Sequence, residues 1–87
     1  MAIPLPDRLR YLGANIRLGR RRRGWTQERL AEAAGLDPRY VRTLESDKAN
    51  PKAAVLVAVA EALGIPLGPL FRKARIPKKK PGRPRLP

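Results

Sequence analysis

Two short helical patterns, separated by a turn of only three residues, make residues 26–46 the most constraining part of the chain. Thr26 is a favourable N-cap for the first helix, and Gly35 can adopt the left-handed backbone that ends it. Asp37 and Pro38 then supply an N-cap and a proline at the first position of the second helix. Two helices joined by so short a turn must cross at a steep angle.

The apolar residues of this segment are spaced so that they bury one face behind the turn. The larger ones are Leu30, Leu36, Val41 and Leu44. Ala31 is small, as a close crossing of the two helices requires, and polar and cationic residues remain for the outer face of the second helix. The segment therefore predicts a helix-turn-helix. Its second helix, from about residue 37 to residue 46, is placed to enter the DNA major groove.

A further helix is predicted before this segment. It should begin near Asp7, which can cap it, and end at Gly24 after a run of arginines that suits the negative end of the helix dipole. Its apolar stripe is Leu5, Leu9, Leu12 and Ile16. Trp25 and Leu30 stand at hydrophobic-staple positions around the next N-cap, so we expect Trp25 to belong to the core.

A fourth helix is predicted after the helix-turn-helix. Asn50 and Pro51 repeat the cap-plus-proline start, and Gly64 closes the helix. Its buried stripe is Leu56, Val59, Ala60 and Leu63. A short fifth helix is expected within residues 65–71, and no strand is expected because β-branched residues do not alternate with polar ones. The predicted fold is all-α, a compact bundle of four to five short helices.

The charge of the chain is strongly positive and unevenly distributed. It carries 20 Lys and Arg against 7 Asp and Glu, a net charge of +13, and such a field attracts polyanions. Residues 72–87 hold eight of the basic side chains and no acid, interspersed with prolines. We therefore predict a folded domain over residues 7–73 and a disordered or extended basic tail over residues 74–87.

Composition also excludes several classes of function. The chain has no Cys and no His, which removes disulfides, thiolate zinc sites, a cysteine nucleophile and the usual general base. No apolar run approaches the roughly 18–20 residues that cross a bilayer, and the first residues lack the order of a secretory signal. We expect a cytoplasmic, nucleoid-associated protein that is not an enzyme and needs no metal, cofactor, membrane or small-molecule ligand.

The chain resembles the Cro/phage-repressor, or Xre, family of helix-turn-helix proteins over about residues 8–72. The matching stretches are Ile16-Arg17, Arg20, Gly24-Trp25-Thr26-Gln27, Leu30-Ala31, Gly35-Leu36, Tyr40-Val41, Leu44-Glu45, Asn50-Pro51, Ala60-Glu61-Ala62-Leu63-Gly64 and Leu70-Phe71. Several separate motifs thus agree in order and spacing. The resemblance implies a lambda-repressor-like fold.

The resemblance also implies which residues face DNA. Gln27 falls where the family hydrogen-bonds a backbone phosphate, a role that the free amides of a helix start would support. Pro38, Arg39, Arg42 and Thr43 fall where family members meet base edges. Arg39 is the best candidate for a bidentate contact with guanine. Pro38 replaces a residue that is often polar, so it offers only an apolar contact.

Other cationic residues are candidates for contacts with backbone phosphates. They are Arg21, Arg22, Arg23 and Lys48. The arginines are also compatible with a solvated helix end, and Arg42 is equally compatible with a phosphate contact. Tyr40 is expected to be half-buried support. The resemblance further implies a structural ion pair between Arg20 and Glu45, and it leads us to expect weaker local packing at Gly19, where the family has an apolar residue.

The basic tail suggests minor-groove binding. Its Gly82-Arg83-Pro84 resembles the core of an AT-hook, in which an extended, arginine-bearing strand enters the narrow groove of A·T-rich DNA. Pro81 stands where an arginine is often found. A polybasic arm that contacts only phosphates is the alternative. The candidate contact residues of the tail are Lys78, Lys79, Lys80, Arg83 and Arg85.

The leading functional hypothesis is a sequence-specific regulator of transcription, a repressor in preference to an activator, bound to double-stranded DNA. The resemblance implies a symmetric homodimer on an inverted-repeat operator. Leu67, Leu70 and Phe71 of the expected fifth helix are the candidate dimer surface, and the alternative is that they seal the core. Two alternatives are an antitoxin that binds both DNA and a toxin, and an architectural nucleic-acid-binding protein that uses charge alone.

Overall fold

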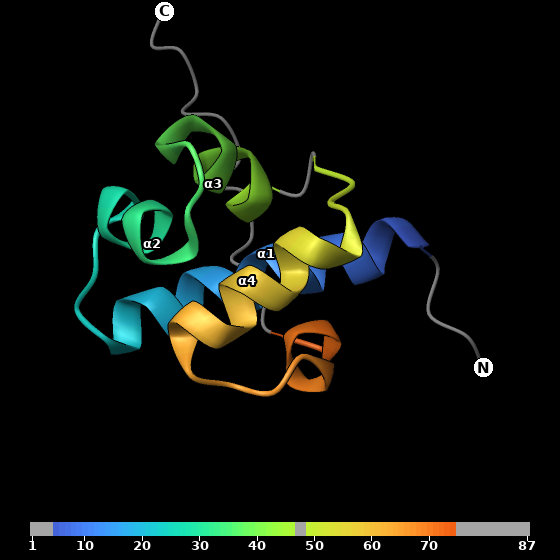
Figure 1. Cartoon of the computed structure of the whole chain (residues 1–87). Helices are drawn as coiled ribbons and strands as arrows, with labels where there is room; N and C mark the ends of the chain where they lie inside the picture. Colours follow the sequence, from blue (N-terminus) through green and yellow to red (C-terminus); the bar gives the residue numbers. More distant parts are fainter. Residues whose placement is uncertain (1–4, 47–48, 75–87) are drawn as a thin grey trace, which may run out of the picture.

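Four α-helices and a closing 3₁₀ helix make up the described part of the chain, and no strand occurs in it. The computed structural model describes residues 5–46 and 49–74. The elements are α1 (Leu5–Arg22), α2 (Gln27–Ala34), α3 (Pro38–Glu45), α4 (Ala53–Leu63) and the 3₁₀ helix η1 (Gly68–Phe71). In the view of Figure 1, α2 and α3 lie on one side of α1 and α4, which overlap in the picture, and η1 lies on the other side. The predicted all-α bundle is confirmed.

The local signals around the turn act as the sequence predicts. The Thr26 hydroxyl oxygen accepts a hydrogen bond from the Arg29 backbone amide at 3.0 Å and so caps α2. Gly35 has a φ of 70°, which ends α2 in the left-handed region that glycine adopts without strain. An Asp37 carboxylate oxygen accepts from the Arg39 amide at 2.7 Å and caps α3. These contacts fix where each helix of the pair begins and ends.

The core lies where all the helices meet. Its fully buried larger side chains are Leu12, Ile16, Leu30, Val41, Leu44, Val59 and Leu70. Trp25, Leu36 and Tyr40 are half-buried and pack against this cluster, as predicted for Trp25 and Tyr40. Burial of these apolar surfaces holds α3 in place from behind, because Val41 and Leu44 occupy its inner face.

Two predicted helix starts are wrong. α1 begins at Leu5, so Asp7 is a first-turn residue that complements the helix dipole and does not cap the helix. α4 begins at Ala53 after Lys52, which is extended and provides no side-chain cap, so Asn50 and Pro51 do not start it. The reason is tertiary, because the non-helical segment before α4 places Ala49 in the core with only 8% of its surface exposed.

Two glycines of α1 mark close helix contacts. A Cβ at Gly13 would lie 2.7 Å from the backbone carbonyl oxygen of Leu44, so only glycine allows α1 to approach the end of α3 so closely. A Cβ at Gly19 would lie 3.2 Å from the Leu63 Cδ1 atom. The space that we expected to weaken packing at Gly19 is therefore taken up by the end of α4.

The segment after α4 is anchored by one side chain of α1. The Asn15 amide nitrogen donates to the carbonyl oxygens of Leu70 at 2.8 Å and Arg72 at 2.7 Å, with a longer contact of 3.3 Å to Pro69. Leu70 itself is fully buried. The prediction that Leu70 belongs to a dimer surface is therefore wrong, because this side chain seals the core.

Among the described helices, none combines the length and apolar character that crossing a bilayer requires.

Candidate nucleic-acid interface

The outer face of α3 carries the four predicted base-reading residues. Pro38, Arg39, Arg42 and Thr43 are all exposed, whereas Val41 and Leu44 are buried on the opposite face. The Arg39 side chain is 90% exposed, and only a long 3.9 Å contact joins it to Asp37. Helical spacing places the four residues on one continuous strip of the surface. The strip is thus free to meet a groove of DNA.

Thr43 and Ser46 close the end of α3 with their hydroxyl groups. The Thr43 hydroxyl donates to the Arg39 carbonyl oxygen at 3.1 Å, and the Ser46 hydroxyl donates to the Thr43 carbonyl oxygen at 2.8 Å. The bond to Arg39 uses the only hydroxyl donor of Thr43. In this conformation Thr43 therefore offers an acceptor oxygen and a methyl group to a ligand.

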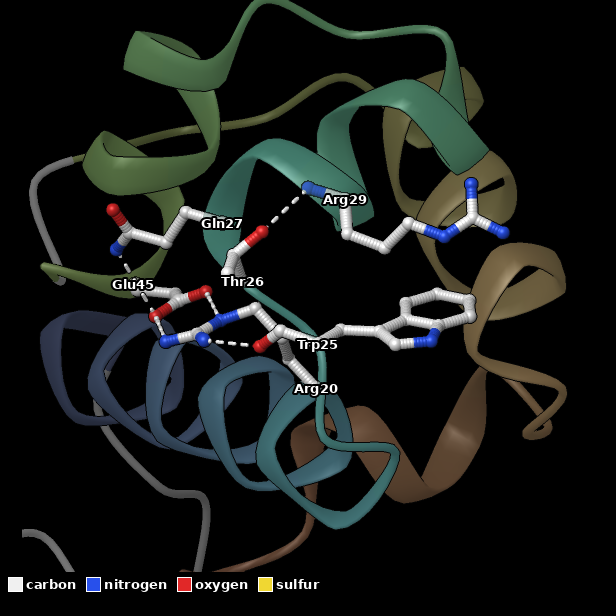
Figure 2. A network of polar contacts seen from close by, with 6 residues as sticks. All are labelled: Arg20, Trp25, Thr26, Gln27, Arg29 and Glu45. Atoms are coloured by element: carbon white, nitrogen blue, oxygen red, sulfur yellow. Dashed lines mark hydrogen bonds and ion pairs between the residues drawn. The ribbon is translucent and has the colours of Figure 1, made fainter.

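A partly buried ion pair holds α3 against α1 (Figure 2). Arg20 Nε lies 2.7 Å from Glu45 Oε2 and Nη2 lies 3.0 Å from Oε1, a bidentate geometry. Arg20 Nη1 also donates to the Trp25 carbonyl oxygen at 2.7 Å. The hydrogen bond with Glu45 raises the pKa of Arg20, and burial of the guanidinium opposes this effect in part. The ion pair that the resemblance implies is therefore present.

Gln27 joins the same network from the start of α2. Its amide nitrogen donates to Glu45 Oε1 at 3.3 Å, and Figure 2 shows the side chain reaching from α2 toward the end of α3. The amide group has a second donor hydrogen, which this bond does not use. Glu45 thus orients Gln27 beside the exposed face of α3.

A shallow surface depression of about 390 Å³ lies over this network, and we name it the Arg42 depression. It is lined by Arg17, Arg20, Arg21, Gln27, Arg42, Glu45 and Ser46. Glu45 is paired with Arg20, so Arg17, Arg21 and Arg42 give the depression an excess of positive charge. Such a cluster, with an amide donor beside it, can bind an anion such as a backbone phosphate.

Arg17 was not among the residues that the sequence predicted for the site. Arg17 and Arg21 are four residues apart in α1 and therefore share a helix face. That spacing was a signal that could have identified Arg17 together with Arg21. What the spacing could not show is that the crossing of α1 and α3 brings both residues to Arg42.

The other predicted phosphate contacts are not brought to this depression. Arg22 lines a separate hollow between α1 and the segment after α4. Arg23 Nε donates to the Leu63 carbonyl oxygen at 3.0 Å, and its guanidinium lies 5.0 Å from the Trp25 ring centroid. Arg23 therefore stabilises the end of α4. Lys48 and the tail residues Lys78, Lys79, Lys80, Arg83 and Arg85 lie outside the described residues.

Comparison with known proteins agrees with this architecture. A helix-turn-helix family model matches residues 16–70. The immunity repressor protein of Bacillus phage phi105 is 44% identical over 54 residues, which are 62% of this chain and 38% of that protein. An uncharacterized HTH-type transcriptional regulator, y4dJ of Sinorhizobium fredii, is 34% identical over 59 residues, 68% of this chain and 77% of that protein.

Solved structures show the same arrangement of helices. The restriction-modification controller protein C.AhdI from Aeromonas hydrophila has a TM-score of 0.70 at 35% identity, covering 72% of this chain and 96% of that one. A hypothetical transcription factor, NHTF from Neisseria, has a TM-score of 0.72 at 35% identity, covering 82% and 83%. The chain spans about a third of the length of two curated relatives, the phage repressor and the SutR regulator of Escherichia coli. The chain belongs to the helix-turn-helix family of the Cro/phage-repressor type.

Proposed function

We propose that this chain is a sequence-specific regulator of transcription, a repressor in preference to an activator, that binds double-stranded DNA. One observation carries the proposal. Arg42 belongs both to the exposed strip of α3 and to the depression where Arg17, Arg21 and Gln27 gather. A helix that reads a groove needs phosphate contacts at its side to fix its register, and the Arg42 depression supplies them.

In this proposal the exposed strip of α3 contacts bases, and the Arg42 depression contacts a backbone phosphate. The Arg39 side chain is 90% exposed, has only the long contact with Asp37 and does not line the depression, so it reads guanine through two parallel hydrogen bonds. Thr43 offers its methyl and acceptor oxygen to a base edge, and Pro38 gives an apolar contact. Arg42 contacts a phosphate, because it lines the same depression as Arg17. Gln27 adds its remaining amide donor to that phosphate.

Two copies of the chain would read an inverted repeat. A single helix-turn-helix contacts few base pairs, and a symmetric dimer would place two α3 helices about 34–36 Å apart. Leu67 is 37% exposed and Phe71 is half-buried, so these two residues remain candidates for the dimer surface after the loss of Leu70. The basic tail would add phosphate or minor-groove contacts, and the protein would act in the cytoplasm on the nucleoid.

Selection of bound duplexes from a random pool, at a stated salt concentration, tests this function. Enrichment of a palindromic sequence is expected, with at least about a thousandfold preference over unrelated duplexes. The Arg39→Gln protein should lose the part of that preference that comes from one base pair per half-site, whereas Arg29→Gln, which removes an exposed arginine paired with Glu32 on α2, should keep all of it. A pool that shows no enrichment with the unmodified chain would point to binding by charge alone and contradict the proposal.

A further inference from the structure

A second concave surface lies along α1, on the side of the segment that follows α4. It consists of two neighbouring hollows that share Asn15 and Leu18, with volumes of about 400 Å³ and about 660 Å³. The first lies between α1 and residues 63–72, and the second lies between α1 and residues 73–74. We name the pair the Leu18 groove.

The centre of the Leu18 groove is apolar. Leu18 is 45% exposed and lines both hollows. Ile65, Pro66 and Pro69 continue the apolar surface in the first hollow, and Ala14 and Ala74 do so in the second. A ligand of this surface must therefore bury an apolar side chain against Leu18.

The rim of the groove is positively charged. Arg22 and Arg72 line the first hollow, and Arg17, Arg21 and Lys73 line the second. No carboxylate lines either hollow in the described part of the chain. Negative charge next to an apolar anchor is therefore the chemistry that complements this surface.

Charge also separates the candidate occupants. A second copy placed symmetrically on the groove would bring the same cations face to face, and like charges at an interface disfavour association. The part of the tail that follows Ala74, residues 75–87, carries Lys and Arg but no acid, so it would be repelled as well. An acidic segment of another protein carries the opposite charge and therefore complements the rim.

We propose that the Leu18 groove binds an acidic segment of another protein, with an apolar side chain of that segment seated on Leu18. Arg17 and Arg21 line both the second hollow and the Arg42 depression. If DNA phosphates use these two arginines, as the proposed function states, the acidic segment and DNA compete for them. The partner then acts as an antagonist that releases the regulator from DNA.

Fluorescence anisotropy of the full chain with a labelled synthetic helical peptide of Glu and Leu, the two arranged on opposite helix faces, tests the docking. Leu18→Gln should weaken peptide binding by about tenfold, the effect of losing one buried leucine contact. Val57→Gln is the matched control, because Val57 is 43% exposed on α4 and lines neither hollow. Peptides with Gln for Glu or Ser for Leu should bind at least about tenfold more weakly.

Two further variants distinguish DNA binding at the Arg42 depression from peptide binding at the Leu18 groove. Arg22→Gln should weaken the peptide and leave duplex affinity unchanged, because Arg22 lines the groove and not the depression. Arg42→Gln should weaken duplex binding and leave the peptide unchanged. Unlabelled acidic peptide should also displace a bound duplex.

Three results with the peptide would overturn the inference. They are no binding of the Glu and Leu peptide, equal binding of the peptide with Ser for Leu, and equal peptide affinity of the Leu18→Gln and unmodified proteins. A dimer in sedimentation that dissociates only in the Leu18→Gln protein would assign the groove to a second copy and overturn it too. Loss of duplex preference with intact Leu18-dependent peptide binding would contradict the proposed function and leave the docking supported.

Discussion

Arg20 and Glu45 join the last turns of α1 and α3 through two hydrogen bonds of 2.7 and 3.0 Å. Their side chains are only 11% and 5% exposed, so water screens the pair poorly. Gln27 and the Trp25 carbonyl oxygen bind the same two side chains. One ion pair therefore fixes the position of α3 and also orients Gln27, the residue predicted to bind a DNA phosphate.

Glu45→Ala should destabilise the fold by about 2–3 kcal/mol, because it leaves the Arg20 guanidinium, which is only 11% exposed, without its carboxylate. Urea unfolding followed by circular dichroism measures the change. Glu32→Ala is the control, since its ion pair with Arg29 is exposed and should contribute less than about 1 kcal/mol. Equal losses in the two proteins would show that the Arg20–Glu45 pair is no more important than a surface pair.

Gly13→Ala should also destabilise the fold. The added Cβ would lie 2.7 Å from the Leu44 carbonyl oxygen, so α1 and α3 must separate. We expect a loss of about 1–3 kcal/mol, which exceeds the gain of at most about 1 kcal/mol from the better helix propensity of alanine. Gly19→Ala is the comparison and should cost less than Gly13→Ala, because its new Cβ would lie 3.2 Å from the Leu63 Cδ1 atom, a side-chain atom that can shift, and not against a backbone carbonyl. A stabilised Gly13→Ala protein would contradict the close contact.

The sequence was sufficient for features whose cause is local. Thr26, Gly35 and Asp37 act on neighbouring backbone groups, so their residue types predicted the helix ends correctly. The start of α4 was predicted wrongly. Asn50 and Pro51 favour a helix start, but burial of Ala49 in the core holds residues 49–52 outside the helix. Burial by distant segments leaves no mark in the local sequence.

The same distinction applies to the candidate site. Helical periodicity was enough to predict the exposed strip of α3, because residues on one helix face are fixed by spacing alone. The grouping of Arg17 and Arg21 with Arg42 depends on how α1 crosses α3, which Gly13 permits. Residues 20–23 are all arginine and cannot be told apart in the sequence. In the fold, however, Arg23 binds the carbonyl oxygen of Leu63 at the end of α4.

Arg17→Gln should weaken binding to all duplexes alike if Arg17 contacts a phosphate. Each lost phosphate contact lowers the slope of log affinity against log salt by about 0.9. Titrations of the selected site and an unrelated duplex at several salt concentrations measure this slope. Arg29→Gln, on the outer side of α2, is the control and should leave the slope unchanged. A normal slope for Arg17→Gln would remove Arg17 from the phosphate contacts.

Deletion of residues 74–87 should lower non-specific affinity and flatten the same salt dependence while the preferred site stays the same. The reason is electrostatic, because this segment carries six Lys and Arg residues and no acid. A truncated protein with an unchanged slope would show that the tail does not contact DNA.

The affinity of the Arg39→Gln protein for the selected site and for each single-base-pair variant of that site tests the central claim most directly. If Arg39 reads guanine from α3, the substitution should abolish discrimination at one base pair per half-site, at a cost of about 1–3 kcal/mol. Discrimination at the other positions should remain. A uniform loss at every position, or unchanged discrimination throughout, would contradict the assignment of α3 as the helix that reads DNA.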